Sequence, residues 1–161
     1  MALNTPITRW YGLRVWLVGA SAGIGLGLAE QLHAAGARVI VSARRQAALE
    51  AFAAKHPRSL ALPLDVTDRQ AVVTAAMPLV EDEPLDLVCF CAGQHQTMRA
   101  DDLDLNALLQ HREVNLVGAL HLIAAHAQEL TAADYSLIAL PLDPGPDPGE
   151  TTELSVQVCV G

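Results

Sequence analysis

The first residues whose type and spacing could do chemistry are the glycines of the run Gly19-Ala20-Ser21-Ala22-Gly23-Ile24-Gly25. An apolar stretch typical of a buried strand precedes this run, and residues with helical spacing follow it. Glycines in a strand–turn–helix let the backbone approach a pyrophosphate, and the start of the helix offers unpaired N–H groups to the phosphates. The run therefore predicts a dinucleotide site, with a plain tight turn as the alternative.

The six histidines are the next candidates, for proton transfer or for metal binding. His95 follows an apolar run that should end at the ligand-binding edge of a sheet, so it is the best substitute acid, with an exposed loop position as the alternative. His121 and His126 are five residues apart, which places them about 140° apart around a helix. They cannot chelate one metal well, so we expect solvated helix positions for both and no metal site.

The composition excludes several classes of protein. Apolar residues make up 52% of the 161 residues and charged residues 17%, which indicates one folded domain. The net charge is −8 and the ten basic residues are scattered, so nucleic-acid binding has little support. The N-terminal residues make a poor signal peptide, and the most apolar window, 15–29, is interrupted by glycines. We expect neither secretion nor membrane insertion.

The three cysteines also argue against a secreted protein. Cys89 and Cys91 are two residues apart in a predicted strand, a poor geometry for a disulfide. Neither they nor Cys159 have partners at metal-ligand spacing, so we expect buried free thiols and a cytoplasmic protein.

Short β-branched and apolar runs alternate with helical patterns along the chain, an arrangement that must position these side chains. Strands are predicted at 14–18, 38–42, 59–64, 85–91 and 136–140, and helices at 24–35, 46–55, 68–80 and 106–129. Such alternation indicates βαβ units with right-handed crossovers. We predict an α/β fold with a doubly wound parallel sheet of Rossmann type, in three αβα layers.

The same pattern places the whole chain, 1–161, in a single domain. Its core is 14–140, a Pro/Gly/Asp-rich loop follows at 141–150, and an edge strand is expected at 152–160. Whether that last strand runs parallel or antiparallel stays open, because the thirteen residues from Pro141 to Glu153 are just enough for a parallel return.

Four short motifs occur in order between residues 15 and 140. They are the glycine run with spacing G-x-x-x-G-x-G, Asp65-Val66 after the third strand, Cys91-Ala92-Gly93 after the fourth, and Asn115 in the long helix. In this order and spacing they resemble the short-chain dehydrogenase/reductase family. The resemblance implies that Gly19, Gly23 and Gly25, with Ser21, Ala22 and Ile24 between them, form the cofactor loop.

The resemblance also implies roles for the other motifs. Asp65 and Val66 contact the adenine ring. Cys91, Ala92 and Gly93 stand where the family has Asn-Ala-Gly, so Cys91 replaces a polar side chain by a small apolar one and should weaken the cofactor pocket. Asn115 corresponds to one member of the family's catalytic tetrad.

The cofactor can be predicted from charge. Aligned with the family, Ala43 stands where an NAD enzyme has a carboxylate for the ribose 2′-OH, and Arg44 and Arg45 follow. A guanidinium suits a 2′-phosphate, so we expect NADP(H) in preference to NAD(H). The alternative is that both arginines only begin an exposed helix.

The other members of the tetrad are missing from this sequence. The alignment puts Leu140 where the family has a serine. No Tyr-x-x-x-Lys occurs, because the chain has two tyrosines, Tyr11 and Tyr135, and one lysine, Lys55, at unrelated positions. Only Asn115 is retained, so we expect hydride transfer between NADP(H) and a carbonyl or alcohol to be impaired or lost.

Three interpretations follow. The first is a shortened NADP(H)-binding member of this family with impaired chemistry. The second is a non-catalytic module that senses NADP(H) or binds a partner, and the third is a remnant without selected function. In each, Leu109, Leu116, Leu120 and Ile123 lie on one face of helix 106–129. That face predicts self-association.

Overall fold

Hydrogen bonds order the strands into one sheet, β3-β2-β1-β4-β5-β6. The computed structural model describes residues 7–99, 101–126, 136–139 and 156–159, with β5, β6, Val80 and Asp82 described by their backbone alone. The strands are β1 (Arg14–Val18), β2 (Arg38–Ser42), β3 (Leu60–Ala61), β4 (Leu87–Phe90), β5 (Ser136–Ala139) and β6 (Val156–Cys159). The first five are parallel, as predicted.

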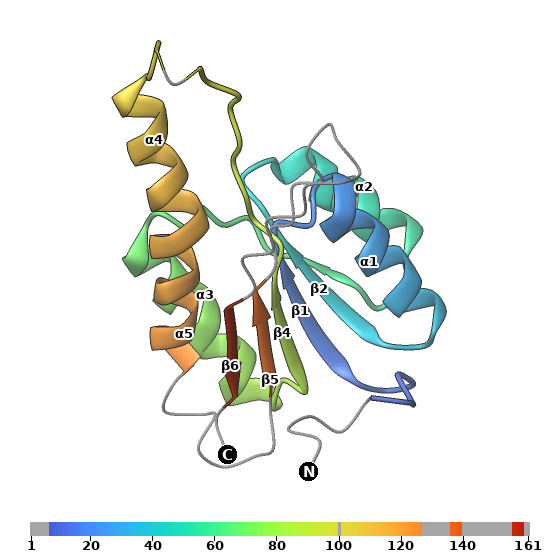
Figure 1. Ribbon diagram of the computed structural model, residues 1–161. Coiled ribbons are helices and arrows are strands. Elements are labelled where there is room, and N and C mark those ends of the chain that lie inside the picture. The colour runs from blue at the N-terminus through green and yellow to red at the C-terminus, as the bar shows by residue number, and fades with distance from the viewer. Residues whose placement is uncertain (1–6, 100, 127–135, 140–155, 160–161) are drawn as a thin grey trace.

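Helices cover both faces of this sheet, which gives the predicted three-layer α/β fold (Figure 1). They are α1 (Gly23–Ala34), α2 (Gln46–Lys55), α3 (Arg69–Asp82), α4 (Leu105–Arg112), the π-helical turn η1 (Glu113–Val117) and α5 (Gly118–His126). Helices α1 and α2 lie on one face, and α3, α4 and α5 lie on the other.

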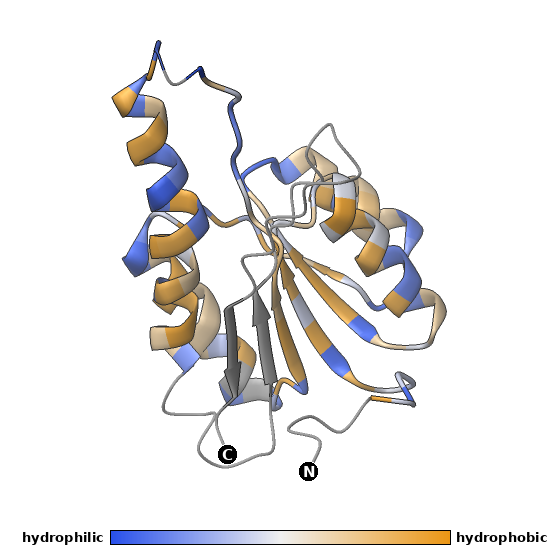
Figure 2. Ribbon diagram, in the orientation of Figure 1, coloured by the Kyte–Doolittle hydropathy of each residue, from blue (hydrophilic) through white to orange (hydrophobic). Residues whose placement is uncertain are grey.

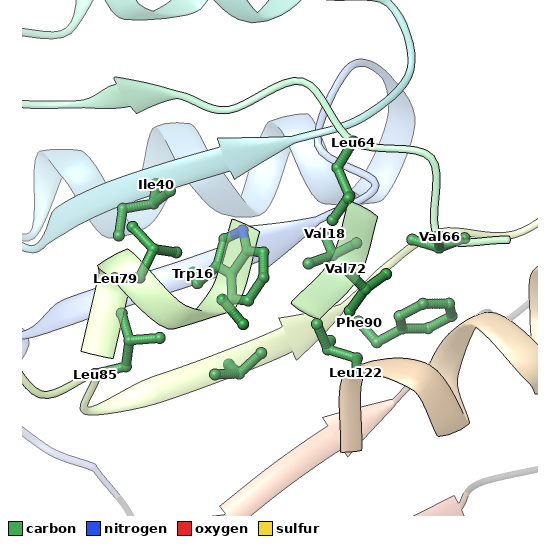
Figure 3. Close-up of a cluster of buried hydrophobic side chains, with 12 residues drawn as sticks. Trp16, Val18, Ile40, Leu64, Val66, Val72, Leu79, Leu85, Phe90 and Leu122 are labelled. Carbon is green, nitrogen blue, oxygen red and sulfur yellow. The ribbon is translucent and has the colours of Figure 1, made fainter. Parts of the chain in front are cut away.

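Alternating side chains of the strands supply both cores. Val15 and Leu17 of β1 join the residues under α1 and α2, whereas Trp16 and Val18 join those under α3 and α5. Figure 2 shows the hydrophobic strands β1, β2 and β4 between the two helix layers. Figure 3 shows the second core, in which Trp16 and Phe90 are the largest side chains. A parallel sheet that is covered on both faces explains why these strands are apolar throughout.

Helix α1 ends where the sequence predicts. Gly36 has φ 90°, and Ala37 donates a hydrogen bond to the carbonyl of Leu32 (3.0 Å). This is a Schellman motif, which glycine favours because it has no Cβ. Helix α3 begins one residue after the predicted 68, and Asp68 caps it, since its carboxylate accepts from the amide of Ala71 (3.0 Å).

Strand β3 is shorter than the predicted 59–64. The amides of Leu62 and Leu64 still donate to the carbonyls of Val41 and Ala43 (2.9 and 3.0 Å), so the segment continues alongside β2. Between them Pro63 has no N–H group, and proline ends a regular ladder.

Strand β6 pairs with β5 in the antiparallel direction, with Ser136 opposite Cys159. This settles the question that the sequence left open. The loop predicted at 141–150, Leu140 and Tyr135 lie outside the described residues.

The segment predicted as one long helix, 106–129, is helical over its described part but is not one regular α-helix. The π turn η1 separates α4 from α5, and it contains Asn115. π turns within α-helices occur frequently at functional sites.

The predicted solvent exposure of His121 and His126 is wrong. His126 is 4% exposed and its ring lies 5.3 Å from that of Trp16, while Nδ1 of His121 donates to the carbonyl of Val66 (3.0 Å). His126 lies on the face of α5 that packs on the sheet, whereas His121 is half-buried against the segment after β3. Spacing along the helix does not show whether a histidine ring is buried or exposed to water.

Substitution Ser42→Ala is expected to destabilise the fold. The indole N–H of Trp16 donates to the hydroxyl of Ser42 (2.8 Å), and both side chains are fully buried. Losing this acceptor should lower the free energy of unfolding by about 1–3 kcal/mol. Chemical denaturation measures the change. Ser59→Ala is the matched control, because the hydroxyl of Ser59 is buried with no partner among the described residues and should be removable at little cost.

Candidate functional site

A cavity of about 460 Å³ lies where β1 and β4 end, the point at which the chain order reverses in the sheet. Ligands of doubly wound folds bind at such a switch point, outside the carboxyl ends of the strands. The cavity is lined by Val18, Gly19, Ser21, Ala22, Gly23, Ala43, Arg44, Arg45, Leu64, Asp65, Val66, Cys91, Ala92, Gly93 and Val114. We refer to it as the first cavity. Residues of three of the four sequence motifs therefore meet here, namely the glycine run, Asp65-Val66 and Cys91-Ala92-Gly93.

Glycine is required at two positions of the loop that forms one wall. Gly19 has φ 97°, and a Cβ there would lie 2.5 Å from the Cα of Ala92. A Cβ on Gly25 would overlap with the carbonyl oxygen of Gly19 and lie 3.1 Å from the Cα of Ala20. The loop thus touches the segment after β4 and the start of α1 backbone to backbone.

Hydrogen bonds from neighbouring strands hold this loop in place. The carbonyl of Ser42, at the end of β2, accepts from the amides of Gly19 and Ala20 (2.7 and 3.1 Å). The amide of Cys91 donates to the carbonyl of Val18 (2.6 Å). The glycine loop is therefore fixed to both strands that flank β1.

The N-terminus of α1 faces this cavity and is suited to an anion. Its N-cap, Ala22, makes no side-chain capping bond, and its first turn carries no acidic residue. Amides there keep their hydrogen-bonding capacity and the positive end of the helix dipole is not neutralised. Of the residues predicted to form the cofactor loop, Ser21, Ala22 and Gly23 line this cavity, whereas Ile24 and Gly25 line a neighbouring one.

Two arginines border the cavity on the β2 side. Arg44 and Arg45 follow Ala43, and both are exposed. Arg45 donates through Nη2 to the carbonyl oxygen and the hydroxyl of Ser21 (3.3 and 3.2 Å). The sequence singled out Arg44, but Arg45 is the arginine that contacts the glycine loop. Arg45 follows β2 and Ser21 lies in the loop after β1, and nothing in the sequence indicated that these two residues would be in contact.

Asp65 and Val66 line the cavity next to the end of β2, since the amide of Leu64 donates to the carbonyl of Ala43 (3.0 Å). The carboxylate of Asp65 accepts from the amide and hydroxyl of Thr67 (3.0 and 2.8 Å), which fixes the turn after β3. Val66 is buried against Gly118, where a Cβ would lie 2.7 Å from Cγ2 of Val66. Asp65 and Val66 are thus held in place by Thr67, just before α3, and by Gly118 of α5.

Cys91 is half-buried and lines the cavity together with Ala92 and Gly93. Burial raises the pKa of its thiol to about 11 and that of Cys89 to about 12. Both thiols are therefore protonated and uncharged near neutral pH, and neither is an activated nucleophile. At this position the cavity is therefore lined by the small, uncharged side chain of Cys91, where the family has asparagine.

Asn115 does not reach the first cavity. Its side-chain amide forms a pair of hydrogen bonds with the backbone of Gln94, accepting from the N–H (2.7 Å) and donating to the carbonyl (2.9 Å). This ties η1 to the loop after β4. Asn115 is consequently a positioning residue for that loop in the structure.

A second cavity of about 860 Å³ lies between that loop, the start of α1 and α4, and shares Ala22, Cys91 and Gly93 with the first. Its lining also includes Ile24, Gly25, Gln94, His95, Gln96, Thr97, Met98, Leu103, Leu108, His111 and Asn115. His95 is exposed in a loop, as the alternative interpretation held. His111 was not predicted from the sequence as a site residue, although its place four residues before Asn115 on a helix puts both on one face.

A model of the short chain dehydrogenase family matches residues 14–139. The chain belongs to the short chain dehydrogenase family. Its match covers every described element up to β5, and both cavities lie within it.

Two relatives illustrate how much of a short chain dehydrogenase is present. Dehydrogenase/reductase SDR family member 7 of Homo sapiens is 32% identical over 117 residues, which are 67% of this chain and 34% of that protein. Oxidoreductase BOA17 of Botryotinia fuckeliana (strain B05.10) is 31% identical over 116 residues, 70% of this chain and 42% of that protein. The chain spans less than half the length of these relatives.

Solved short chain dehydrogenase structures have the same fold. A short-chain dehydrogenase from Streptomyces avermitilis superimposes with a TM-score of 0.74 at 27% identity, over 81% of this chain and 52% of that one. An NADPH-bound carbonyl reductase from chicken fatty liver gives a TM-score of 0.69, also at 27% identity, over 77% of this chain and 50% of that one.

Within residues 7–99 and 101–126, and in β5 and β6, no helix is long and apolar enough to cross a membrane. Over the same residues, no three histidine, cysteine or acidic side chains gather as metal ligands would.

The glycine requirement can be tested with two substitutions. Gly19→Ala places a Cβ against the backbone of Ala92 at a positive φ, and should lower the free energy of unfolding by about 2–4 kcal/mol. In Gly27→Ala of α1 the new Cβ meets nothing within 4 Å, so this variant should gain about 0.5–1 kcal/mol. Urea unfolding gives both values, and equal stability of the two variants would contradict the close approach.

Proposed function

We propose that the first cavity binds NADP(H) in preference to NAD(H). The observation that carries the proposal is the pair of guanidinium groups, Arg44 and Arg45, at the end of β2, where Ala43 provides no carboxylate. A carboxylate there would repel a 2′-phosphate, whereas a guanidinium donates two parallel hydrogen bonds to one.

The remainder of the cavity suits the rest of a dinucleotide. The uncapped N-terminus of α1 and the glycine loop would take the pyrophosphate, and Asp65 and Val66 would border the adenine. The carbonyl reductase from chicken fatty liver, which has the same fold, is described as NADPH-bound. This likeness supports the proposal for the present chain.

Binding should alter the contact between Arg45 and Ser21. In the structure the guanidinium of Arg45 is bonded to the loop that a pyrophosphate would occupy. We expect this side chain to exchange its bonds to Ser21 for bonds to the ligand, while Arg44 is available to the 2′-phosphate.

The reaction class is that of the family, transfer of hydride between NADP(H) and a carbonyl or alcohol. Bound NADP(H) would supply or accept the hydride. We propose that this chain is impaired or inactive in that step, since Asn115 is the only tetrad member in its sequence and no Tyr-x-x-x-Lys occurs. With Leu140 in place of serine, no hydroxyl stands there to polarise a carbonyl.

A non-catalytic role is the second candidate, namely a module that senses NADP(H) or binds a partner. It is favoured by the same absence of tyrosine–lysine from a sequence that keeps the cofactor motifs. Saturable NADPH binding without turnover of any carbonyl supports this role. We also propose a cytoplasmic location, because Cys89 and Cys91 are free thiols.

Calorimetric titration tests the cofactor preference. NADPH should bind more tightly than NADH, and Arg44→Ala should weaken NADPH binding about tenfold, equivalent to about 1.4 kcal/mol, with little change for NADH. Gly23→Asp, at φ 58° beside the phosphates, should abolish binding of both. Lys55→Ala on the exposed end of α2 is the control and should change neither. Equal affinity for the two cofactors would overturn the preference.

We further propose that copies of the chain associate through the long helix. Several of its leucines are exposed, including Leu105 (68%), Leu116 (52%) and Leu120 (52%). Burying such a row would remove apolar surface from water.

Sedimentation equilibrium tests this association. Leu116→Asp should raise the dissociation constant of the dimer at least tenfold, because it puts a charge into the interface. Met77→Asp is the control, since Met77 is 56% exposed on α3 and away from this row. A monomer across a wide range of concentration would refute the association.

A further inference from the structure

The backbone carbonyl of Val66, in the wall of the first cavity, is held by a side chain of α5. It accepts a hydrogen bond from Nδ1 of His121 (3.0 Å), 55 residues further along the chain. In the described part of the chain no backbone amide donates to this carbonyl, and Val66 is only 6% exposed. A backbone carbonyl with so little access to water needs a donor, because burying it unpaired is costly. His121 supplies that donor.

The turn that contains Val66 has two other attachments. The amide of Leu64 donates to the carbonyl of Ala43 (3.0 Å), which ties the start of the segment to β2. The carboxylate of Asp65 accepts from the amide of Thr67 (3.0 Å), which closes the turn on itself. Neither bond joins the turn to α5. Among the hydrogen bonds of the described residues, the one from His121 makes that connection.

Packing supports the same attachment. A Cβ on Gly118, one turn before His121, would lie 2.7 Å from Cγ2 of Val66. Helix α5 therefore contacts the side chain of Val66 at Gly118 and its carbonyl at His121. The residues on either side of His121 differ in environment, since Leu120 is 52% exposed and Leu122 is 1% exposed. An apolar residue at position 121 would fill the same space, but it would have no N–H for the carbonyl.

The hydrogen bond determines which nitrogen of the ring carries a proton. A carbonyl oxygen only accepts, so the proton must be on Nδ1 of His121. A neutral ring in this tautomer and a charged ring both supply the donor. The contact is thus a fixed attachment of the turn to the helix.

The same helical segment is attached to a second lining segment. The side chain of Asn115, in η1, bonds the backbone of Gln94 in the loop after β4 (2.7 and 2.9 Å). His121 likewise bonds the backbone of the turn after β3. Asp65 and Val66 of that turn line the first cavity alone, whereas Gln94 lines only the second. The two attachments therefore act on different sites.

We propose that His121 is a positioning residue for the adenosine half of a dinucleotide in the first cavity. It lines neither cavity and acts through the carbonyl of Val66. The inference rests on the proposed function, in which Asp65 and Val66 border the adenine. Without the donor the turn loses its hydrogen bond to α5, so the adenine should bind more weakly, whereas the phosphate contacts at α1 and Arg44 are unchanged.

Adenosine 2′,5′-bisphosphate is the probe, because it carries the adenine and the 2′-phosphate of NADP(H) without the nicotinamide. Calorimetric titration of the full chain compares two variants. His121→Leu removes the donor and should weaken binding at least fivefold. His121→Asn places an amide N–H near the position of Nδ1 and should stay within twofold of the unsubstituted chain. Unchanged affinity in His121→Leu, or equal weakening in both variants, would overturn the proposal.

The amide signals of the chain without ligand show whether the effect is confined to the turn. In His121→Leu the NMR signals of 65–67 should shift, and those of 19–23 should keep their positions. Shifts of similar size in both segments would mean that the whole site is disturbed, and would contradict a role limited to the adenosine half.

A measurement on the unsubstituted chain covers the case in which His121→Leu does not fold. Nitrogen NMR of the imidazole distinguishes a protonated nitrogen from a bare one. At a pH where the ring is neutral, the proton should be on Nδ1. A proton on Nε2 instead would contradict the hydrogen bond to Val66, and the proposal with it.

His33 offers a matched control. Its Nε2 donates to the carbonyl of Pro57 (3.0 Å), so it is also a ring that holds a backbone carbonyl, but it lines neither cavity. His33→Leu should leave the affinity for adenosine 2′,5′-bisphosphate unchanged. A loss as large as that in His121→Leu would contradict a specific role for His121.

The unsubstituted chain separates this inference from the cofactor proposal. If it binds neither NADPH nor adenosine 2′,5′-bisphosphate, the cofactor proposal is contradicted and the inference falls with it. If it binds both, and His121→Leu binds them equally well, the inference alone is contradicted.

Discussion

The rest of the structure depends on one close approach, that of Gly19 to the backbone of Cys91 and Ala92. At this point the ends of β1 and β4 come so near that no side chain fits between them. The carbonyl of Ser42 holds the same loop from the other side, so three strand ends are fixed relative to one another. The N-terminus of α1, the arginines after β2 and the segment after β4 can only then face a common cavity. The packing of the strand ends thus creates the cavity at the switch point, and the polar groups only line it.

A second contact decides how the two cavities are divided. The backbone of Asn115 is part of the π turn η1, and its side chain forms two hydrogen bonds with the backbone of Gln94. The loop after β4 therefore has a fixed course between the first cavity and α4. One cavity has arginines and amides for an anion, and the other has a wall of apolar and uncharged polar side chains. The two cavities therefore differ in chemical character, although they share Ala22, Cys91 and Gly93.

Where a single physical rule dominated, the sequence predicted the structure closely. The apolar strands Arg14–Val18 and Arg38–Ser42 and the alanine-rich helix Gln46–Lys55 have the predicted bounds, because burial on both faces or helix propensity determines them locally. The glycine loop and the paired motifs also lie together as predicted. What failed depends on packing between distant segments. His126 was expected in water but lies against Trp16, Arg45 contacts Ser21 across the cavity, and His111 enters a wall that only the folded chain creates.

Pro63 has a consequence for how this protein meets other chains. The amides of Leu62 and Leu64 point toward β2, so the position between them points away from the sheet, where an edge strand would offer a donor to a newcomer. Proline has no such donor, and β3 is only two residues long. That side of the sheet is therefore a poor template for adding a strand from another molecule, the usual start of edge-to-edge aggregation. Growth by strand addition is therefore disfavoured at the β3 edge of the sheet.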